Sequence, residues 1–149
     1  MALESAEIQE MRNAVRALCA QYGEDYWLEL DRTHDYPSEF VKELTTSGFL
    51  TVLIPEEYGG AGLGVQEAAV VMEEVCRSGA HAGACHAQMY VMGSVLRHGN
   101  DEQKKAYLPK IASGELRLQS FGVTEPTTGT DTTSLKTTCL LYTSDAADD

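Results

Sequence analysis

The sequence has 149 residues, of which 43% are hydrophobic and 23% charged, and this composition predicts a folded chain of one-domain size rather than a disordered one. Its formal net charge of -12 excludes the clustered basic surface that binding to a nucleic-acid backbone requires. It shows neither a basic and apolar targeting segment nor a run of about 20 apolar residues, which predicts a cytoplasmic protein without a membrane span.

Three helices are predicted before Gly48. Residues 4–22 carry apolar side chains at steps of three and four, which predicts one helical face that ends at Gly23. A short helix is predicted over residues 26–30, and a third begins near Pro37 and ends at Gly48. The inward side chains are predicted to be Ile8, Met11, Val15, Leu18 and Tyr22 in the first helix and Phe40, Val41 and Leu44 in the third.

A glycine-rich loop follows the third helix. An apolar run over residues 49–54 meets Pro55, and the next stretch contains Gly59, Gly60, Gly62 and Gly64. Such a stretch predicts a loop that bends tightly or lets another group approach its backbone closely. Because the strand–turn–helix context and the spacing of a dinucleotide fingerprint are missing, these glycines are interpreted as shaping a loop.

Three further helices are predicted over residues 65–77, 82–98 and 102–112. The middle one is rich in small and soft residues, which is typical of a buried helix with close neighbours. Asn100 or Asp101 is expected to cap the last helix. The helix 102–112 is predicted to turn Tyr107, Leu108 and Ile111 inward. The helix 65–77 is predicted to turn Glu67, Glu73, Glu74 and Arg77 to water.

Two strands are predicted after the helices. Residues 116–123 alternate between apolar and polar side chains, and residues 134–138 resemble the start of a second strand beyond the loop 124–131. Two strands cannot bury both of their faces, so the β region is predicted to be incomplete.

The cysteines and histidines predict no metal site and no disulfide framework. Cys19, Cys76, Cys85 and Cys139 are widely spaced and form no C-x-x-C pair. His81 and Cys85 are four residues apart, but no third or fourth ligand accompanies them, and the adjacent His86 points elsewhere on a helix.

The segment 121–131 is dense in hydroxyl groups and backbone N–H groups at a predicted strand end, with Pro126 and Gly129 fixing its shape. Such donors can bond the carbonyls and ring nitrogens of an isoalloxazine, which favours a polar and planar ligand. An ordinary polar turn is the alternative.

Three motifs in this order resemble the acyl-CoA dehydrogenase family. The sequence GVTEPTTGTD at 122–131 is similar to the family signature T-E-P-x-x-G-S-D, which lies between a helical domain and a β-domain. Residues 54–62, IPEEYGGAG, resemble the P-E-E-Y-G-G-x-G loop, and residues 98–109, HGNDEQKKAYLP, with SGE at 113–115, resemble a third family segment.

The resemblance implies a mainly α fold: a helical-bundle domain over residues 1–115, followed by the first strands of a truncated β-barrel domain over residues 116–138. It implies FAD as the cofactor. The residues implied to bind it are Phe121, Gly122, Val123, Thr124, Gly129 and Thr130, while Asp131 is expected to order the loop. Thr130 replaces the usual serine and keeps its hydroxyl group between the flavin and the pantetheine part of the substrate.

The resemblance also implies an acyl-lining face on the helix 82–98. Gly83, His86 and Tyr90 recur there at i, i+3 and i+7, with Gly83 leaving room for the acyl chain and Tyr90 limiting it. A core or interface role for His86 and Tyr90 is the equally weighted alternative.

The activity implied is the α,β-desaturation of an acyl-CoA thioester by an FAD-dependent oxidoreductase. The family's glutamate base lies in a carboxy-terminal bundle, so no catalytic residue is assigned in this chain, which is expected to be inactive alone. The whole protein is expected to form a homotetramer and to pass electrons to an electron-transfer flavoprotein. The alternatives are an acyl-CoA oxidase or flavin monooxygenase of the same fold and a non-enzymatic helical binding module.

Residues 139–149, CLLYTSDAADD, resemble the translation of a transposase-type sequencing adaptor. They are therefore predicted to be a non-native tail that follows Thr138.

Overall fold

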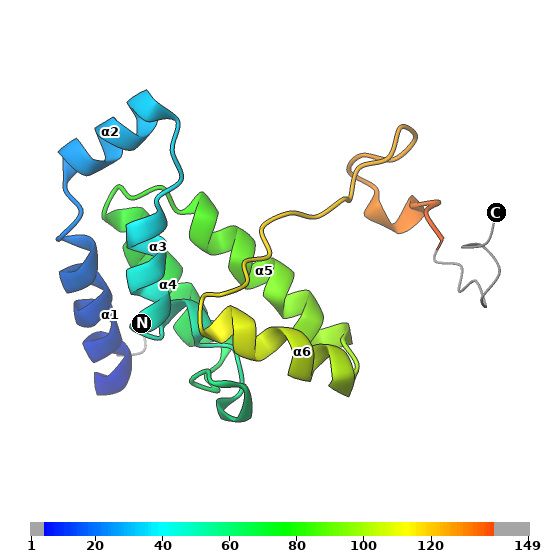
Figure 1. The fold of residues 1–149 in the computed structure, drawn as a ribbon, viewed down its shortest axis with the longest axis horizontal. Helices are drawn as coiled ribbons and strands as arrows, with labels where there is room; N and C mark the ends of the chain where they lie inside the picture. The colour runs from blue at the N-terminus through cyan, green and yellow to red at the C-terminus, as the bar shows by residue number, and fades with distance from the viewer. Residues whose placement is uncertain (1–4, 139–149) are drawn as a thin grey trace.

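A computed structural model describes residues 5–138 and contains six α-helices in that range. Three short 3-10 turns, named η1 to η3, accompany them (Figure 1). The fold is mainly α, as predicted. The helices are α1 Ala6–Cys19, α2 Glu24–Thr33, α3 Ser38–Thr46, α4 Val65–Arg77, α5 Gly83–His98 and α6 Asp101–Ala112, and the turns are η1 Phe49–Thr51, η2 Glu56–Tyr58 and η3 Thr132–Ser134.

Side-chain caps fix where two of these helices begin. The Ser5 hydroxyl accepts a hydrogen bond from the Ile8 N–H at 3.3 Å and starts α1. Asn100, one of the two predicted caps, accepts from the Gln103 N–H at 2.8 Å, and the Gln103 side chain accepts from the Asn100 N–H at 3.0 Å. This reciprocal pair is a capping box, which satisfies two of the unpaired N–H groups at the start of α6.

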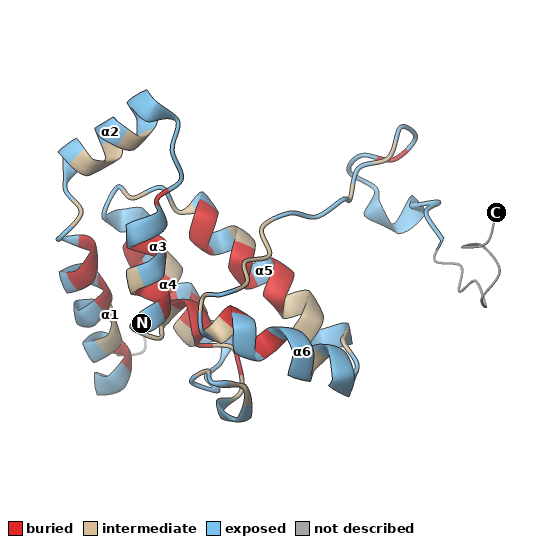
Figure 2. Cartoon of the chain, in the orientation of Figure 1, coloured by how far each residue is buried: buried red, intermediate tan, exposed pale blue. Residues whose placement is uncertain are grey.

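Two groups of buried apolar side chains form the core. The larger group joins α1, α3, α4 and α5, and the fully buried Phe40, Leu44 and Val71 belong to it. The smaller one contains Ile54, Met92, Leu108 and Ile111 and fixes α6 against α5. The buried faces turn toward one another in Figure 2. The predicted inward face of α6 is corrected at Tyr107, which is 45% exposed, because its place on the helix faces solvent.

The glycine loop behaves as predicted. Gly59 lies in the left-handed region with φ 88°, and the backbone of Gly60 passes so close to Ile54 that an added Cβ would lie 2.1 Å from the Ile54 carbonyl oxygen. The Gly62 N–H donates to the same carbonyl at 2.8 Å. The loop therefore folds back onto its own apolar run.

Glu74 corrects the prediction that this glutamate faces water. Its side chain is fully buried, and its carboxylate accepts hydrogen bonds from Arg12 at 2.7 Å and from Arg16 at 2.6 and 3.0 Å. The neighbouring Glu73 stays half exposed and pairs with Arg12 and Arg77. Hydrogen bonds from Arg16 lower the pKa of Glu74. The ion cluster joins α1 to α4.

The two predicted strands are wrong as strands within the described residues. Residues 116–123 and 135–138 lie outside any helix but join no ladder, and Ser134 belongs to the turn η3. One isolated bridge joins Glu125 and Thr128. A strand needs a partner for its N–H and C=O groups, and the described range supplies none beside these segments. The non-native tail predicted for residues 139–149 lies outside the described residues.

No helix within residues 5–138 is long and apolar enough to cross a bilayer.

Candidate functional site

The extended segment 116–121 lies along α5, and the two faces of the segment make different contacts. Arg117 and Gln119 point to one side, where the Arg117 guanidinium lies 5.4 Å from the centre of the Tyr36 ring. Leu116 and Leu118 pack against the smaller core group on the other side. The alternation that predicted a strand is therefore real, and its two faces are an apolar core and the surface of α5.

Gln119 anchors this segment. Its side-chain amide donates to the Ala84 carbonyl of α5 at 3.1 Å and to the Tyr36 hydroxyl at 2.5 Å. These bonds tie together the segment after α6, the start of α5 and the loop between α2 and α3. Sequence reasoning missed Gln119 and Tyr36; the shared face of Arg117, Gln119 and Phe121 at steps of two was the available signal.

An aromatic face runs along the exposed side of α5. The rings of His86 and Tyr90 meet edge to face with centroids 4.9 Å apart, and Phe121 stacks on Tyr90 at 5.1 Å with an interplanar angle of 18°. Tyr90 is 39% and Phe121 47% exposed. Gly83 lies on the same face two turns earlier. The structure thus has the three residues predicted for the acyl group exposed on one side of α5, and it brings Phe121, which was predicted for the flavin, into contact with Tyr90.

The predicted cofactor loop continues from Phe121 and leads away from the helices (Figure 1). Gly122, Thr124, Gly129 and Thr130 are exposed, and Val123 is partly buried. The structure does not bring these residues to the aromatic face.

Internal hydrogen bonds hold the loop. The N–H and C=O groups of Glu125 and Thr128 exchange two bonds of 3.0 Å, which close a tight turn. The Asp131 carboxylate accepts from the hydroxyls of Thr133 and Ser134 at 2.6 Å each, so it orders the loop as expected. These two bonds, with that from Ser134 the larger, lower the pKa of Asp131.

Glu125 joins the loop to the segment that follows it. Its carboxylate accepts from the Lys136 N–H at 2.8 Å, from the Thr137 N–H at 2.7 Å and from the Thr137 hydroxyl. These donors lower the pKa of Glu125, with the Thr137 hydroxyl the largest cause. A carboxylate that accepts so many bonds is held as an anion and serves the loop's shape.

A cavity of about 800 Å³ lies beside the start of α5. Gly83 lines it together with residues of α2, the loop before α3 and the Gln119 anchor. The sequence did not predict this cavity, because it forms between segments far apart in the chain.

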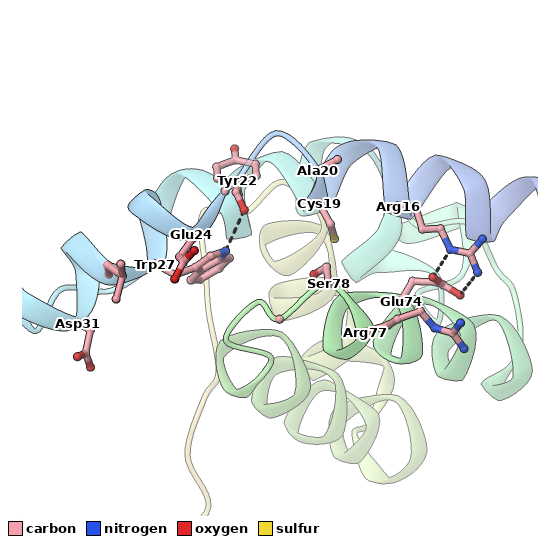
Figure 3. Close-up of a pocket in the computed structure, with 13 residues that line it drawn as sticks. Arg16, Cys19, Ala20, Tyr22, Glu24, Trp27, Asp31, Glu74, Arg77 and Ser78 are labelled. Atoms are coloured by element: carbon pink, nitrogen blue, oxygen red, sulfur yellow. Dashed lines mark hydrogen bonds and ion pairs between the residues drawn. The ribbon is translucent and has the colours of Figure 1, made fainter.

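A second cavity, of about 680 Å³, lies between α1, α2 and the end of α4 (Figure 3). Arg16 and Glu74 both line it, and the Arg16 guanidinium donates to the Glu74 carboxylate (Figure 3). The Trp27 indole N–H donates to the Tyr22 carbonyl at 3.0 Å. None of the predicted ligand residues, all of which the structure describes, lines this cavity. Its wall contains the ion pair of Arg16 with Glu74, which joins α1 to α4, so we regard it as a packing feature.

The described residues contain no cluster of three or more His, Cys, Asp or Glu side chains arranged to hold a metal ion. Burial raises the pKa of the Cys85 thiol to about 12, which leaves it protonated and unreactive near neutral pH. The exposed aromatic face, with the neighbouring cavity and the loop beyond it, is therefore the candidate site. Its exposed rings can pack against an apolar or aromatic group.

Comparisons with known proteins identify this architecture. Residues 5–115 match the family described as "Acyl-CoA dehydrogenase, N-terminal domain". Acyl-CoA dehydrogenase FadE12 of Mycobacterium tuberculosis is 39% identical over 137 residues, which cover 91% of this chain and 35% of that protein. The chain belongs to the acyl-CoA dehydrogenase family. It spans about a third of the length of the curated relatives it matches.

Solved structures agree with this assignment. A glutaryl-coenzyme A dehydrogenase in complex with glutaryl-CoA superposes with a TM-score of 0.75 at 33% identity, over 91% of this chain and 35% of that one. An acyl-CoA dehydrogenase from Bacillus anthracis complexed with FAD gives a TM-score of 0.78 at 30% identity, over 89% of this chain and 23% of that one.

Proposed function

We propose that this chain is the amino-terminal part of an enzyme that desaturates acyl-CoA thioesters between the α and β carbons, with FAD as the cofactor. The stack of Phe121 on Tyr90 is the observation that supports this most directly. It joins the start of the flavin-signature segment to the helix face assigned to the acyl group. Relatives named as acyl-CoA dehydrogenases, and a similar structure complexed with FAD, add to that support.

The residues of segment 121–130 fit a flavin edge by their chemistry. Thr124 and Thr130 present exposed hydroxyls that can donate and accept hydrogen bonds, as the carbonyls and nitrogens of a flavin pyrimidine ring require. The other residues proposed to bind FAD are Phe121, Gly122, Val123 and Gly129. Bound FAD would supply an acceptor for the β-hydride of the substrate. Thr130 would lie between the flavin and the pantetheine arm.

The exposed face of α5 would form one wall of the acyl site. Gly83 leaves space, His86 adds a polar edge, and Tyr90 with Phe121 excludes water from the acyl chain. No glutamate of this chain is assigned as the α-proton base. Glu74 is held as an anion between arginines, and Glu125 is engaged by loop donors, so both are poor bases.

The proposal extends to the organisation of the whole protein. Residues 1–115 would form the amino-terminal helical domain and residues 116–138 the start of a β-domain, with the base supplied from elsewhere. The whole enzyme would be a homotetramer that passes electrons to an electron-transfer flavoprotein. Residues 139–149 would be foreign to the gene; an independent read of the transcript should diverge after Thr138, and continuation through Asp149 would refute this.

The test uses the full-length protein. It should purify with the visible absorbance of bound flavin, and an acyl-CoA should bleach that absorbance under anaerobic conditions. Slow reoxidation by air is expected for a dehydrogenase and fast reoxidation for an oxidase. A colourless protein that does not take up added FAD would refute the proposal.

Thr124→Val tests the loop assignment. Loss of one hydrogen bond should weaken FAD binding by about fivefold to tenfold, measured by titration of the apoprotein. Thr127→Val is the matched control, because Thr127 is an exposed threonine in the turn of the same loop. Equal FAD affinities in the two variants would contradict the assignment of Thr124.

A further inference from the structure

The cavity of about 800 Å³ beside α5 has the lining of a binding pocket for an apolar ring. Trp27 and Tyr36 supply aromatic walls, while the side chains of Ala84 and Ala87 on α5 are small. Its size falls within the range of about 300–1,000 Å³ that is usual for small-molecule pockets. Asp31, Asp35, Ala80, His81, Gly83 and Gln119 also line it.

The cavity borders the aromatic face at Gly83, which lines the cavity and lies on the same side of α5 as His86 and Tyr90. Gly83, Ala87 and Tyr90 follow one another at steps of four and three along α5, so they form one ridge on the helix surface. A ligand that lies along this ridge from Tyr90 toward the start of α5 reaches the cavity next.

His81 marks the boundary between the two. A Cβ added to Gly83 would lie 2.9 Å from Cε1 of the His81 ring, so the imidazole occupies the space above the glycine. His81 is exposed and precedes the helix, which leaves its side chain able to rotate. Movement of this ring would open the cavity toward the acyl face without any change in the backbone of α5.

We propose that the cavity takes the distal end of the acyl group, and that the preferred substrates carry an alicyclic or aromatic ring there. This inference rests on the proposed function, since it assigns the substrate class of the same acyl site. Trp27 and Tyr36 both line the cavity, and aromatic side chains favour contact with a ring over contact with a single methylene chain.

The rim of the cavity argues against a substrate that ends in a carboxylate. Asp31 and Asp35 both line the cavity, and their two negative charges outnumber the single positive charge of Arg117 beside Tyr36, so a further negative group would be repelled there. The Tyr36 hydroxyl accepts from Gln119 and can still donate its own hydrogen to an uncharged oxygen on the ring. Neutral ring-bearing acyl groups are thus favoured over dicarboxylic ones.

Activity of the full-length FAD-loaded enzyme gives the first test. We expect a higher kcat/KM for 4-cyclohexylbutanoyl-CoA than for hexanoyl-CoA. Ala87→Phe fills the cavity and should reduce the ratio of the two values by about tenfold or more. Ala80→Leu fills it from the loop and serves if Ala87→Phe fails to fold. Ala106→Phe, at an exposed position on α6, is the matched control and should leave the ratio unchanged.

Fluorescence gives a second test that does not depend on turnover. Trp27 is the single tryptophan of this 149-residue sequence, so the difference between the full-length wild type and Trp27→Phe isolates its signal. Added 4-cyclohexylbutanoate should change that difference signal saturably, and hexanoate should change it much less. The Ala87→Phe protein should lose the response.

The two tests separate failure of this inference from failure of the proposed function. A Trp27 response to the ring compound without desaturation of any acyl-CoA would refute the function and support the pocket. Desaturation of hexanoyl-CoA without a ring preference or a Trp27 response would overturn the pocket. Equal loss of both substrates in the Ala87→Phe and Ala80→Leu variants would also overturn it.

Discussion

Substitution of Glu74 by Gln should destabilise the chain by about 3 kcal/mol. Removing one partner of a buried ion pair costs about 3–5 kcal/mol, because the remaining charge loses its compensation. Glu74 is fully buried, but the Arg16 side chain is 45% exposed, and Arg12 still forms an ion pair with Glu73 at 2.7 Å after the substitution. Because water and Glu73 compensate part of the remaining positive charge, the lower end of that range applies. This loss is a large fraction of the roughly 5–15 kcal/mol that keeps a typical protein folded.

Urea unfolding followed by Trp27 fluorescence measures this loss. With a slope of about 1–3 kcal/mol per M, the midpoint should fall by about 1–3 M. Glu73→Gln is the matched control: Glu73 is the next residue on α4, contacts the same Arg12, and is 48% exposed. Its substitution should shift the midpoint much less, because water screens an exposed pair.

The same pair of proteins gives a test of pH dependence. Hydrogen bonds from Arg16 and then Arg12, opposed by burial, place the folded-state pKa of Glu74 below its ordinary value of 4.5. The stabilisation is therefore complete above that value and is lost as the pH falls through the lower, folded-state pKa. The gap between wild type and Glu74→Gln should be constant near neutral pH and should narrow in acid. A gap that stays the same in acid, or equal losses for the Glu73 and Glu74 variants, would refute this reasoning.

Two further predictions concern side chains of α1, α4 and α5. Gln88 is fully buried, and neither end of its amide has a hydrogen-bond partner among the described residues. Gln88→Met should therefore raise the free energy of unfolding by about 1–3 kcal/mol, which urea unfolding measures as a higher midpoint. Gln66→Met, at an exposed site, should leave the midpoint unchanged. Cys76 is exposed, whereas Cys19 and Cys85 are buried and their thiol pKa values are raised by burial. A thiol reagent should therefore label Cys76 in the native chain, and Cys19 and Cys85 only in denaturant. Peptide mass spectrometry of the labelled chain measures this.

The helices could be predicted from sequence because their signals are local. The steps of three and four, the Asn100 cap and the glycine at 48 act within a few residues of where they stand. Glu74 could not be placed the same way. On its own helix it belongs to a polar stretch, and its burial depends on two arginines 58 and 62 positions earlier in the chain.

The candidate site was half predictable for the same reason. The spacing of Gly83, His86 and Tyr90 predicted a shared face, and the structure has all three exposed on one side of α5. The alternation of residues 116–123 predicted two different faces but not their neighbours, which are a helix and a core group rather than strands. The cavity needs α2, α5 and Gln119 together, and no local pattern encodes that meeting.

The segment from Arg117 to Phe121 connects the parts of the site. Gln119 holds the rim of the cavity through Tyr36 and Ala84, and two residues later Phe121 stacks on Tyr90. Because side chains at steps of two in an extended segment share a face, a shift of one residue would remove both contacts at once. The position of the loop that follows therefore depends on the same contacts that shape the acyl face. A ligand that displaces Phe121 from Tyr90 would also shift Gln119, two residues earlier, and so disturb its hydrogen bonds to Tyr36 and Ala84 at the cavity rim.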